Sequence, residues 1–272
     1  MTTLRRILPI GLLAVLPMTA CDGSSGPDSL IDEALLNYDV AVVSAEATLQ
    51  NLDFMNAAGG GGIAGFIFPA PMDGPQFNCL QRDGLGGCQR AFHDGYTISR
   101  AVTFYDSLGV EQPAFDRLLT ASMHIVFDVD GERERTNWSG SVERHRDMWV
   151  TGLVGEETER TWNGTGENSV LRSRHVDTLP ARTYDMEGSS TLDDVVVPHP
   201  RTRESWPLSG TITREVHVEV LEDGEVVREA DRTVVIVFDG TQYAEMTVNG
   251  ETFTIDLAER RLKRGRRHGQ GG

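Results

Sequence analysis

The stretch Tyr243–Leu257 (YAEMTVNGETFTIDL) decides the fold class of this 272-residue chain. On both sides of the Asn249-Gly250 pair, apolar and polar residues alternate one by one. A period of two is typical of a half-buried β-strand, and Asn-Gly between two such runs is the strongest short-range signal for a β-hairpin. The stretch therefore predicts two antiparallel strands whose alternate side chains, Ala244, Met246, Val248, Phe253, Ile255 and Leu257, face a core.

The same alternation extends through residues 92–258. It is clear in Ala121, Met123, Ile125 and Phe127, and the pairs Asp130-Gly131, Asp223-Gly224 and Asp239-Gly240 predict further turns. Val234–Phe238 is apolar at every position and is predicted to be covered on both faces. The proline-rich segment 197–207 is predicted to bridge two edges of the sheet. We predict a mainly β fold, an antiparallel meander of about ten strands forming a curled sheet or half-barrel.

One amphipathic helix is predicted at 29–52, ahead of the sheet. Ser29 suits its N-cap, Asp32 and Glu33 suit its first turn, and apolar residues recur every three or four positions. The residues of that stripe are Ile31, Leu35, Tyr38, Val42, Ala45, Leu49 and Leu52. A segment rich in glycine and proline follows at 53–91, so we expect irregular chain there.

The first 21 residues have the three parts of an export signal. Arg5 and Arg6 precede the apolar run ILPIGLLAVL (7–16), which is too short to span a bilayer, and small residues precede Cys21. The ending Met18-Thr-Ala-Cys21 resembles the bacterial lipobox, with Met18 where leucine is usual. The resemblance implies cleavage of residues 1–20 and a diacylglycerol on Cys21, followed by a flexible tether over 21–28. An uncleaved signal or an ordinary cleaved one is the alternative.

Two further cysteines, Cys79 and Cys88, flank the turn-forming sequence LQRDGLGG. Outside the cytoplasm an even pair of cysteines normally forms a disulfide, and this spacing fits neither a C-x-x-C redox motif nor a zinc knuckle. We therefore predict a structural disulfide between them.

The charge of the chain is unevenly distributed. Residues 21–259 hold 17 cations against 41 acidic residues, a net charge of −24, so we expect no nucleic-acid partner. Lys263 is the only lysine, which excludes a Schiff-base or P-loop lysine elsewhere. Six cations lie between residues 260 and 267. The segment 259–272 is predicted to be a disordered tail, either solvated or in contact with an anionic envelope surface.

Two trios place a histidine between acidic residues on one face of a predicted strand. They are Glu143, His145 and Asp147, and Glu215, His217 and Glu219. Carboxylate and imidazole ligands suit zinc, manganese or non-haem iron, and two neighbouring strands would build one site. A solvated strand face in an acidic protein explains the same pattern, and no H-E-x-x-H, G-x-S-x-G or G-x-G-x-x-G motif accompanies it.

These observations predict a lipid-anchored protein of the bacterial cell envelope with a binding or structural role, without a cofactor and without catalysis. Two alternatives remain open. A half-barrel with an apolar cavity would be a carrier of lipid or another apolar ligand, and convergence of the two trios would indicate a metal-dependent hydrolase.

Overall fold

The computed structural model describes residues 27–60, 78–82, 88–93, 96–135, 138–174, 182–200, 202 and 205–264. The chain divides into two compact units, Met1–Leu35 and Leu36–Gly272, and the second unit is the one described below. The predicted signal peptide and the tether to residue 26 lie outside the described residues.

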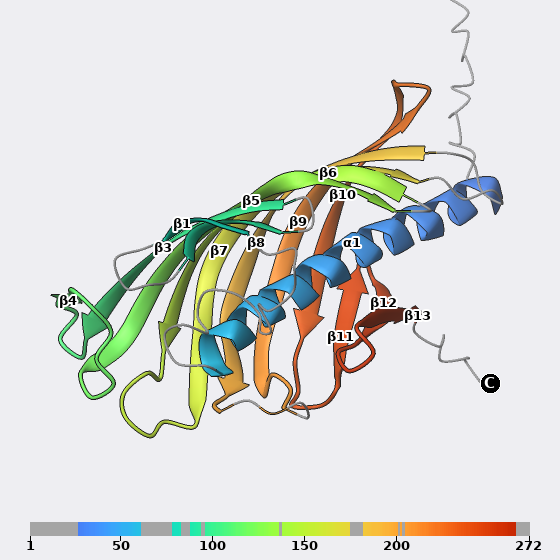
Figure 1. The fold of residues 1–272 in the computed structure, drawn as a ribbon. Helices are drawn as coiled ribbons and strands as arrows, with labels where there is room; N and C mark the ends of the chain where they lie inside the picture. Colours follow the sequence, from blue (N-terminus) through green and yellow to red (C-terminus); the bar gives the residue numbers. More distant parts are fainter. Residues whose placement is uncertain are drawn as a thin grey trace, which may run out of the picture. The chain divides into compact units, whose positions relative to one another are not determined.

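The fold is mainly β, as predicted, with one helix and a large antiparallel sheet (Figure 1). The elements are α1 (Pro27–Gly60), β1 (Asn78–Arg82), β2 (Cys88–His93), β3 (Tyr96–Asp106), β4 (Glu111–Gln112), β5 (Thr120–Arg135), β6 (Trp138–Thr151), β7 (Glu159–Arg174), β8 (Arg182–Pro198), β9 (Ser209–Glu222), β10 (Glu225–Val237), β11 (Tyr243–Val248), β12 (Glu251–Asp256) and β13 (Arg261–Arg264). Each strand pairs with the next along the chain, except that β3 pairs with both β4 and β5. The described strands form an open meander with β1 and β13 at its two ends.

The hairpin predicted at Tyr243–Leu257 is confirmed as β11 and β12. Tyr243 pairs with Asp256 and Val248 pairs with Glu251. Asn249 and Gly250 both have positive φ angles, 46° and 82°, which a two-residue turn of this hand requires. The turns at Asp223-Gly224 and Asp239-Gly240 are also confirmed by the strands on either side of them.

The predicted turn at Asp130-Gly131 is wrong. Both residues lie within β5, where Asp130 pairs with Thr97 on one side and Glu143 on the other. Both residues pair with β3, which begins opposite Gly131, and with β6, which continues past this point to Trp138. The backbone hydrogen bonds of these pairings outweigh the local turn preference of Asp-Gly.

The connection over 197–207 does not bridge two edges of the sheet. It joins β8 to β9, which are neighbours, and the Leu208 amide donates to the Val196 carbonyl. The apolar run Val234–Phe238 is covered on one face only, because Val237 is 43% exposed while Val234 and Ile236 are fully buried.

The helix is longer than predicted and is buried on more than one stripe. It extends past residue 52 to Gly60, and Met55 is buried against the core. Small residues such as Ala41, Ala45 and Ala47 are also buried, so the sheet contacts the helix on several sides. Figure 1 shows this part of α1 lying along the concave side of the curled sheet. We call the face of the sheet that packs against α1 the inner face, and the opposite face the outer face.

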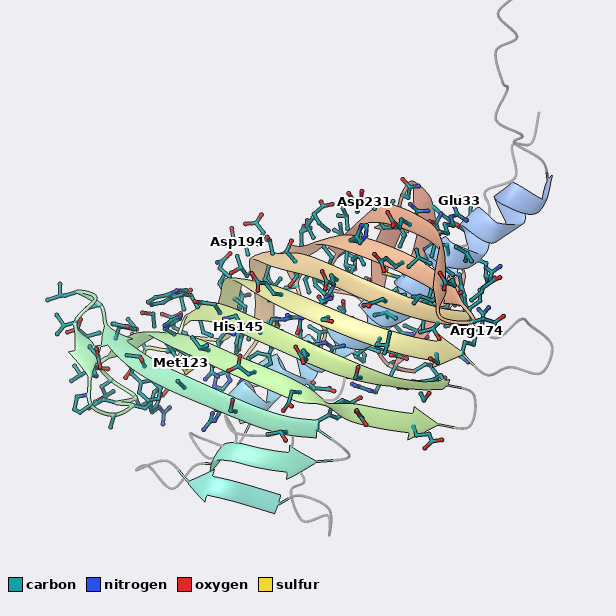
Figure 2. All side chains as sticks on the ribbon, turned by 90° about the horizontal axis from the view of Figure 1, so that it is seen from above. Glu33, Met123, His145, Arg174, Asp194 and Asp231 are labelled. Atoms are coloured by element: carbon teal, nitrogen blue, oxygen red, sulfur yellow. The ribbon has the colours of Figure 1, made fainter. Side chains whose placement is uncertain are left out.

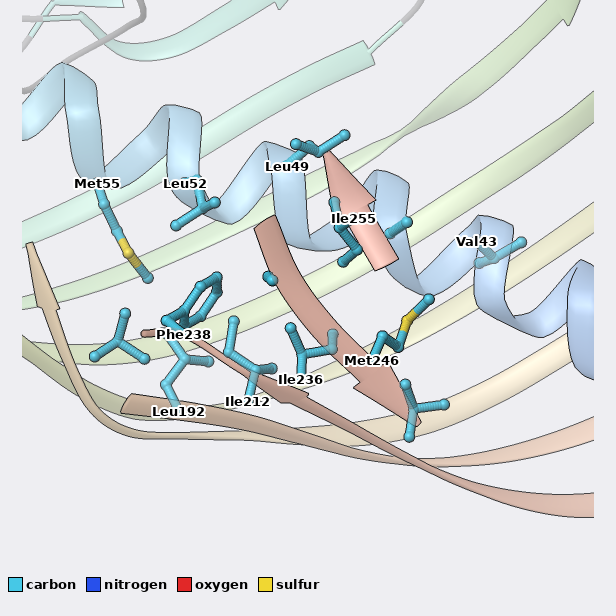
Figure 3. Packing of buried hydrophobic residues seen from close by; sticks show 14 of the residues in the cluster. Val43, Leu49, Leu52, Met55, Leu192, Ile212, Ile236, Phe238, Met246 and Ile255 are labelled. Carbon is cyan, nitrogen blue, oxygen red and sulfur yellow. The ribbon is translucent and has the colours of Figure 1, made fainter. Parts of the chain in front are cut away.

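A continuous apolar row crosses the inner face at right angles to the strands. Its members, paired strand to strand, are Val102, Ile125, Met148, Gly164, Leu192, Ile212, Ile236, Met246 and Phe253. Figure 3 shows Leu192 and Ile212 beside Phe238 below the Leu52–Met55 end of the helix, and Met246 beside Ile255 towards Val43. This row and α1 form the main hydrophobic core.

The segment after Leu257 is not entirely a disordered tail. Residues Arg261–Arg264 form β13, in which Leu262 pairs with Ile255 and packs on the core. Arg260 makes two hydrogen bonds to Asp53 of α1, at 2.8 and 2.6 Å. These contacts attach the beginning of the basic segment to the domain, while residues 265–272 lie outside the described part of the chain.

The region predicted as a loop with a disulfide hairpin contains the strands β1 and β2. Their register places Cys79 opposite Ala91 and Cys88 opposite Arg82. No disulfide is seen in the described part of the structure, and the side chains of both cysteines lie outside it. The disulfide stays a prediction.

Candidate ligand cavity

A cavity of about 430 Å³ lies between α1 and strands β3, β6 and β7. Its apolar wall is formed by residues of the helix and the strands, namely Val43, Leu49, Trp138, Val142 and Val170. Its polar lining includes Glu46, Gln50, Tyr96, Arg144, Arg172 and Arg260. A cavity of this size and mixed lining is typical of sites that bind small organic molecules.

Beside the apolar row, the inner face carries a group of arginines, two of them buried and one, Arg144, half-buried. Arg146 of β6 and Arg214 of β9 lie in one transverse row, separated by Gly166 and Ser190 of the two intervening strands. Arg144 lies two residues from Arg146 on the same face. The side chains of Arg146 and Arg214 are 0% and 2% exposed. We call Arg144, Arg146 and Arg214 the arginine cluster.

The sequence makes room for this cluster with small residues on β7 and β8. A Cβ atom at Gly166 would lie 2.4 Å from Cδ and 2.6 Å from Nη1 of Arg146, so the side chain of Arg146 lies directly over this glycine. Gly188 pairs with Asn168, and Ser190 pairs with Gly166. The small side chains at these positions leave space above the sheet between the arginines. Large side chains at these positions would fill the space that the guanidinium groups occupy.

The cluster is poorly satisfied by protein groups. Arg146 donates from Nη1 to the carbonyl oxygens of His145 and Glu167, both at 2.8 Å. Among the described residues, no hydrogen-bond partner is found for Nε of Arg144 or for Nε and Nη2 of Arg146 and Arg214. Buried polar atoms are normally paired, so these five donors mark an unusual region of the core.

The lowered pKa values of the three arginines agree with the shortage of hydrogen-bond partners around them. Burial and, to a smaller extent, the neighbouring charge of Arg144 lower the pKa of Arg146 to about 10. Burial, followed by the charges of Arg146 and Arg144, lowers the pKa of Arg214 well below its usual range. The pKa of Arg144 is lowered by burial, against the opposing effects of Tyr96 and Glu46. The three cations therefore lie in a poorly solvated region and act on one another.

Other arginines near the cavity are neutralised by carboxylates of α1. Arg172 pairs with Glu46 at 3.1 Å, and Arg174 pairs with Asp39 at 3.0 Å. Arg172 also lies over the ring of Trp138, 4.5 Å from its centre. The helix thus supplies counter-charges at the margin of the inner face, whereas the arginine cluster makes no hydrogen bond or close ion pair with a carboxylate of the described chain.

The two predicted metal trios lie on the outer face and do not meet. Glu143, His145 and Asp147 are on β6, Glu215, His217 and Glu219 are on β9, and β7 and β8 lie between them. Figure 2 shows this face, with His145 and Asp231 labelled. Within the described ranges, no group of three potential metal ligands has a geometry that could hold an ion.

Each histidine of these trios instead pairs with an aspartate of a neighbouring strand. Nδ1 of His145 lies 2.8 Å from Asp128, and Nδ1 of His217 lies 2.8 Å from Asp231. A third pair on the same face joins Nε2 of His124 to Asp147 at 2.7 Å. A shallow groove of about 560 Å³ runs past His145, and its other ionisable lining is mostly acidic: Asp128, Asp130, Glu143, Glu167 and Glu187.

The sequence-based interpretation did not identify the arginine cluster. Arginines in an alternating strand pattern resemble a solvated face, because arginine is rarely fully buried. One signal was available: Arg144 and Arg146 on β6, and Arg172 and Arg174 on β7, occupy the same alternate positions as the buried Met148 and Val170. The position of these arginines in the alternation of the strand therefore indicated which face of the sheet they occupy better than their residue type did.

Comparison with protein-family models, with curated proteins and with solved structures finds no match. Among the described helical residues, none form a segment long and apolar enough to cross a bilayer.

Proposed function

We propose that this chain is a lipid-anchored cell-envelope protein that binds a small apolar or amphipathic ligand between α1 and the sheet, in a non-enzymatic role. The observation that carries the proposal is the 430 Å³ cavity with its apolar wall of helix and strand side chains. Its volume lies within the range of small-molecule sites.

The surroundings of the cavity support binding more than a purely structural role. A helix that only completed a core would leave little room for a ligand, since protein interiors are close-packed. Here the helix approaches the sheet closely at Leu52 and Met55 but leaves the cavity beside Val43 and Leu49. Ion pairs from Asp39 and Glu46 fix the helix at that side of the sheet.

Fluorescence of the neutral apolar probe N-phenyl-1-naphthylamine tests this proposal. The probe should bind the protein, and Val142→Trp should reduce its affinity about tenfold or more, because an indole would fill space beside Val142. Val237→Trp is the matched control, since Val237 lies on the outer face and is already exposed. Equal binding by all three proteins, or no binding by any, would contradict the proposal.

The anchor is part of the same proposal and rests on the lipobox-like ending at Cys21. Several acyl chains hold a protein stably at a membrane, because each buried methylene contributes about 0.8 kcal/mol. Labelling with a fatty-acid analogue should mark the wild type and leave Cys21→Ser unmarked. Equal labelling of both would refute the anchor.

Two further elements of the proposal concern the cysteines of β1 and β2 and the basic segment that follows β12. A disulfide between Cys79 and Cys88 would close a loop of about ten residues and stabilise the fold by roughly 2–3 kcal/mol. Alkylation of unreduced, denatured mature protein should find no free thiol at these positions.

The cations of 260–267 are proposed to orient the protein on an anionic envelope surface. Deletion of 265–272 should therefore weaken the binding of the Cys21→Ser protein to anionic vesicles at low salt.

A further inference from the structure

The arginine cluster presents a physical problem that the protein alone does not solve. Arginine stays protonated in proteins, so the inner face holds two fully buried positive charges, Arg146 and Arg214, and a half-buried one, Arg144. Taking a charge out of water is energetically unfavourable unless a partner compensates. The other arginines beside the cavity have carboxylate partners, at 3.1 Å for Arg172 and 2.6 Å for Arg260, but Arg146 and Arg214 bond to no carboxylate of the described chain.

The unpaired atoms are all donors, and two of the three arginines that carry them line one space. This second, smaller cavity of about 10 Å³ is lined by Arg144 and Arg214 together with Asn168 and Ser44. The polar lining of that cavity contains two guanidinium groups, an amide and a hydroxyl, and no carboxylate. This set of groups favours an anion over a cation or a neutral apolar group.

The smaller cavity adjoins the larger one. Val43, Arg144 and Val170 line both. Arg144 therefore stands between the apolar cavity and the space beside Arg214. The smaller cavity has room for about one water molecule, so a larger group would enter by displacing the side chain of Arg144 toward the larger cavity.

We propose that the arginine cluster binds the oxyanion head group of an amphiphile, a carboxylate or a phosphate, whose apolar chain occupies the 430 Å³ cavity. This inference rests on the proposed function and specifies its ligand class. Guanidinium groups bind carboxylate and phosphate oxygens through paired, charge-assisted hydrogen bonds. Such bonds would satisfy the donors of Arg144 and Arg214, and the apolar wall would cover the chain of the ligand.

Three ligands of equal chain length test the inference by isothermal titration calorimetry: dodecanoate, dodecyl phosphate and 1-dodecanol. The protein is the exported chain carrying Cys21→Ser, so that no acyl anchor competes. Both anions should bind at least about tenfold more tightly than the neutral alcohol, because hydrogen bonds to charged groups exceed those to neutral groups by that much or more. The order of the two anions distinguishes a fatty-acid head group from a phosphate.

Variants of the cluster locate the effect. Arg214→Met and Arg144→Met should bind the anions no better than the alcohol and should keep the affinity for the alcohol. Arg117→Met is the matched control, because Arg117 is exposed and pairs with Glu156 at the surface; this variant should keep the full preference for anions. Arg214→Gln serves as a second variant that retains a polar side chain without the charge.

The ligand-free variants give an independent readout. Arg214→Met should have a melting temperature equal to or above that of the wild type, because a buried charge without a partner is removed. A purely structural arginine would show the opposite, a lower melting temperature and no stabilisation of the wild type by the anions.

The outcomes separate the two proposals. If the alcohol binds as tightly as the anions, the anion inference is overturned and the proposed apolar-ligand function stands. If no ligand binds the wild type, the proposed function falls and the inference falls with it. If the anions keep their preference in both Arg144→Met and Arg214→Met, the arginine cluster is not the head-group site.

Discussion

The inner and outer faces of the sheet are built from alternate residues of the same strands, yet they carry charges of opposite sign. On β6, the inner positions hold Arg144 and Arg146, and the outer positions between and beside them hold Glu143, His145 and Asp147. Acids and their histidine partners continue across the outer face, whereas the inner face has arginines, small residues and the apolar row.

The difference shows why the net charge of a chain is a poor guide to what a site within it binds. A body charge of −24 predicts repulsion of anions. That expectation holds for a surface approached from solvent, and here the acids of the outer face dominate it. The arginine cluster is separated from those acids by the sheet itself, so a ligand in the cavity would experience the local donors rather than the total charge.

The largest expected contrast between the faces concerns two tryptophans on neighbouring strands. Trp162 of β7 is fully buried on the inner face, whereas Trp149 of β6 is 41% exposed on the outer face, where it stacks on His124. Trp162→Ala should lower the free energy of unfolding by about 3–5 kcal/mol. Trp149→Ala should cost about 1 kcal/mol, the contribution of an aromatic contact. Urea denaturation measures both, and equal losses would show that the faces do not differ in packing.

A second contrast compares ion pairs. Asp39 of α1 and Arg174 of β7 are largely buried, and the phenol of Tyr184 has its pKa raised by burial and by a hydrogen bond with Asp39. Asp39→Ala should therefore cost about 2–3 kcal/mol, because it leaves Arg174 buried without its counter-charge. Glu156→Ala breaks a pair between exposed side chains, Glu156 and Arg117, and should cost between zero and about 1 kcal/mol. Thermal unfolding of both variants checks this, and a cost for Glu156→Ala as large as that for Asp39→Ala would contradict it.

The sequence predicted the outer face and the core well, because both follow from alternation. Tyr243–Leu257 combines a strict period of two with a turn that admits positive φ, so local and long-range preferences agree. Asp130-Gly131 has equally strong turn chemistry, but two flanking strands override it. Local sequence does not reveal how far neighbouring strands extend.

The candidate site was less predictable for a related reason. The two histidine trios satisfy a metal-binding pattern within each strand, but two other strands separate them. Conversely, Arg146 and Arg214 are 68 residues apart in the sequence and become members of one row only through the registers of β6 to β9. Their burial depends on the small side chains of Gly166 and Ser190. The role of these two residues can be recognised only when the registers of the strands are known.

The smallest expected effect concerns protonation on the outer face. A hydrogen bond with Asp231 raises the pKa of His217 above 6.5, against a smaller opposing effect of desolvation, with help from the charges of Asp231, Glu219 and Glu229. Since the pKa is raised in the folded state, the stabilisation is fully present below pH 6.5 and is lost as the pH rises through the raised value. NMR titration should show a raised pKa for His217 in the wild type and a lower one in Asp231→Asn. An unchanged pKa in the variant would refute this pairing.

Native mass spectrometry of the protein extracted from its own membrane tests most directly whether the inner face is a binding site for an anionic amphiphile. The wild type should carry the mass of an acyl anchor and, in addition, a non-covalent adduct with a carboxylate or phosphate head group. Arg214→Met should retain the anchor mass and lose the adduct, while Arg117→Met should retain both. A neutral adduct, or an anionic one equally abundant in the wild type and Arg214→Met, would contradict the assignment of the arginine cluster as its binding site.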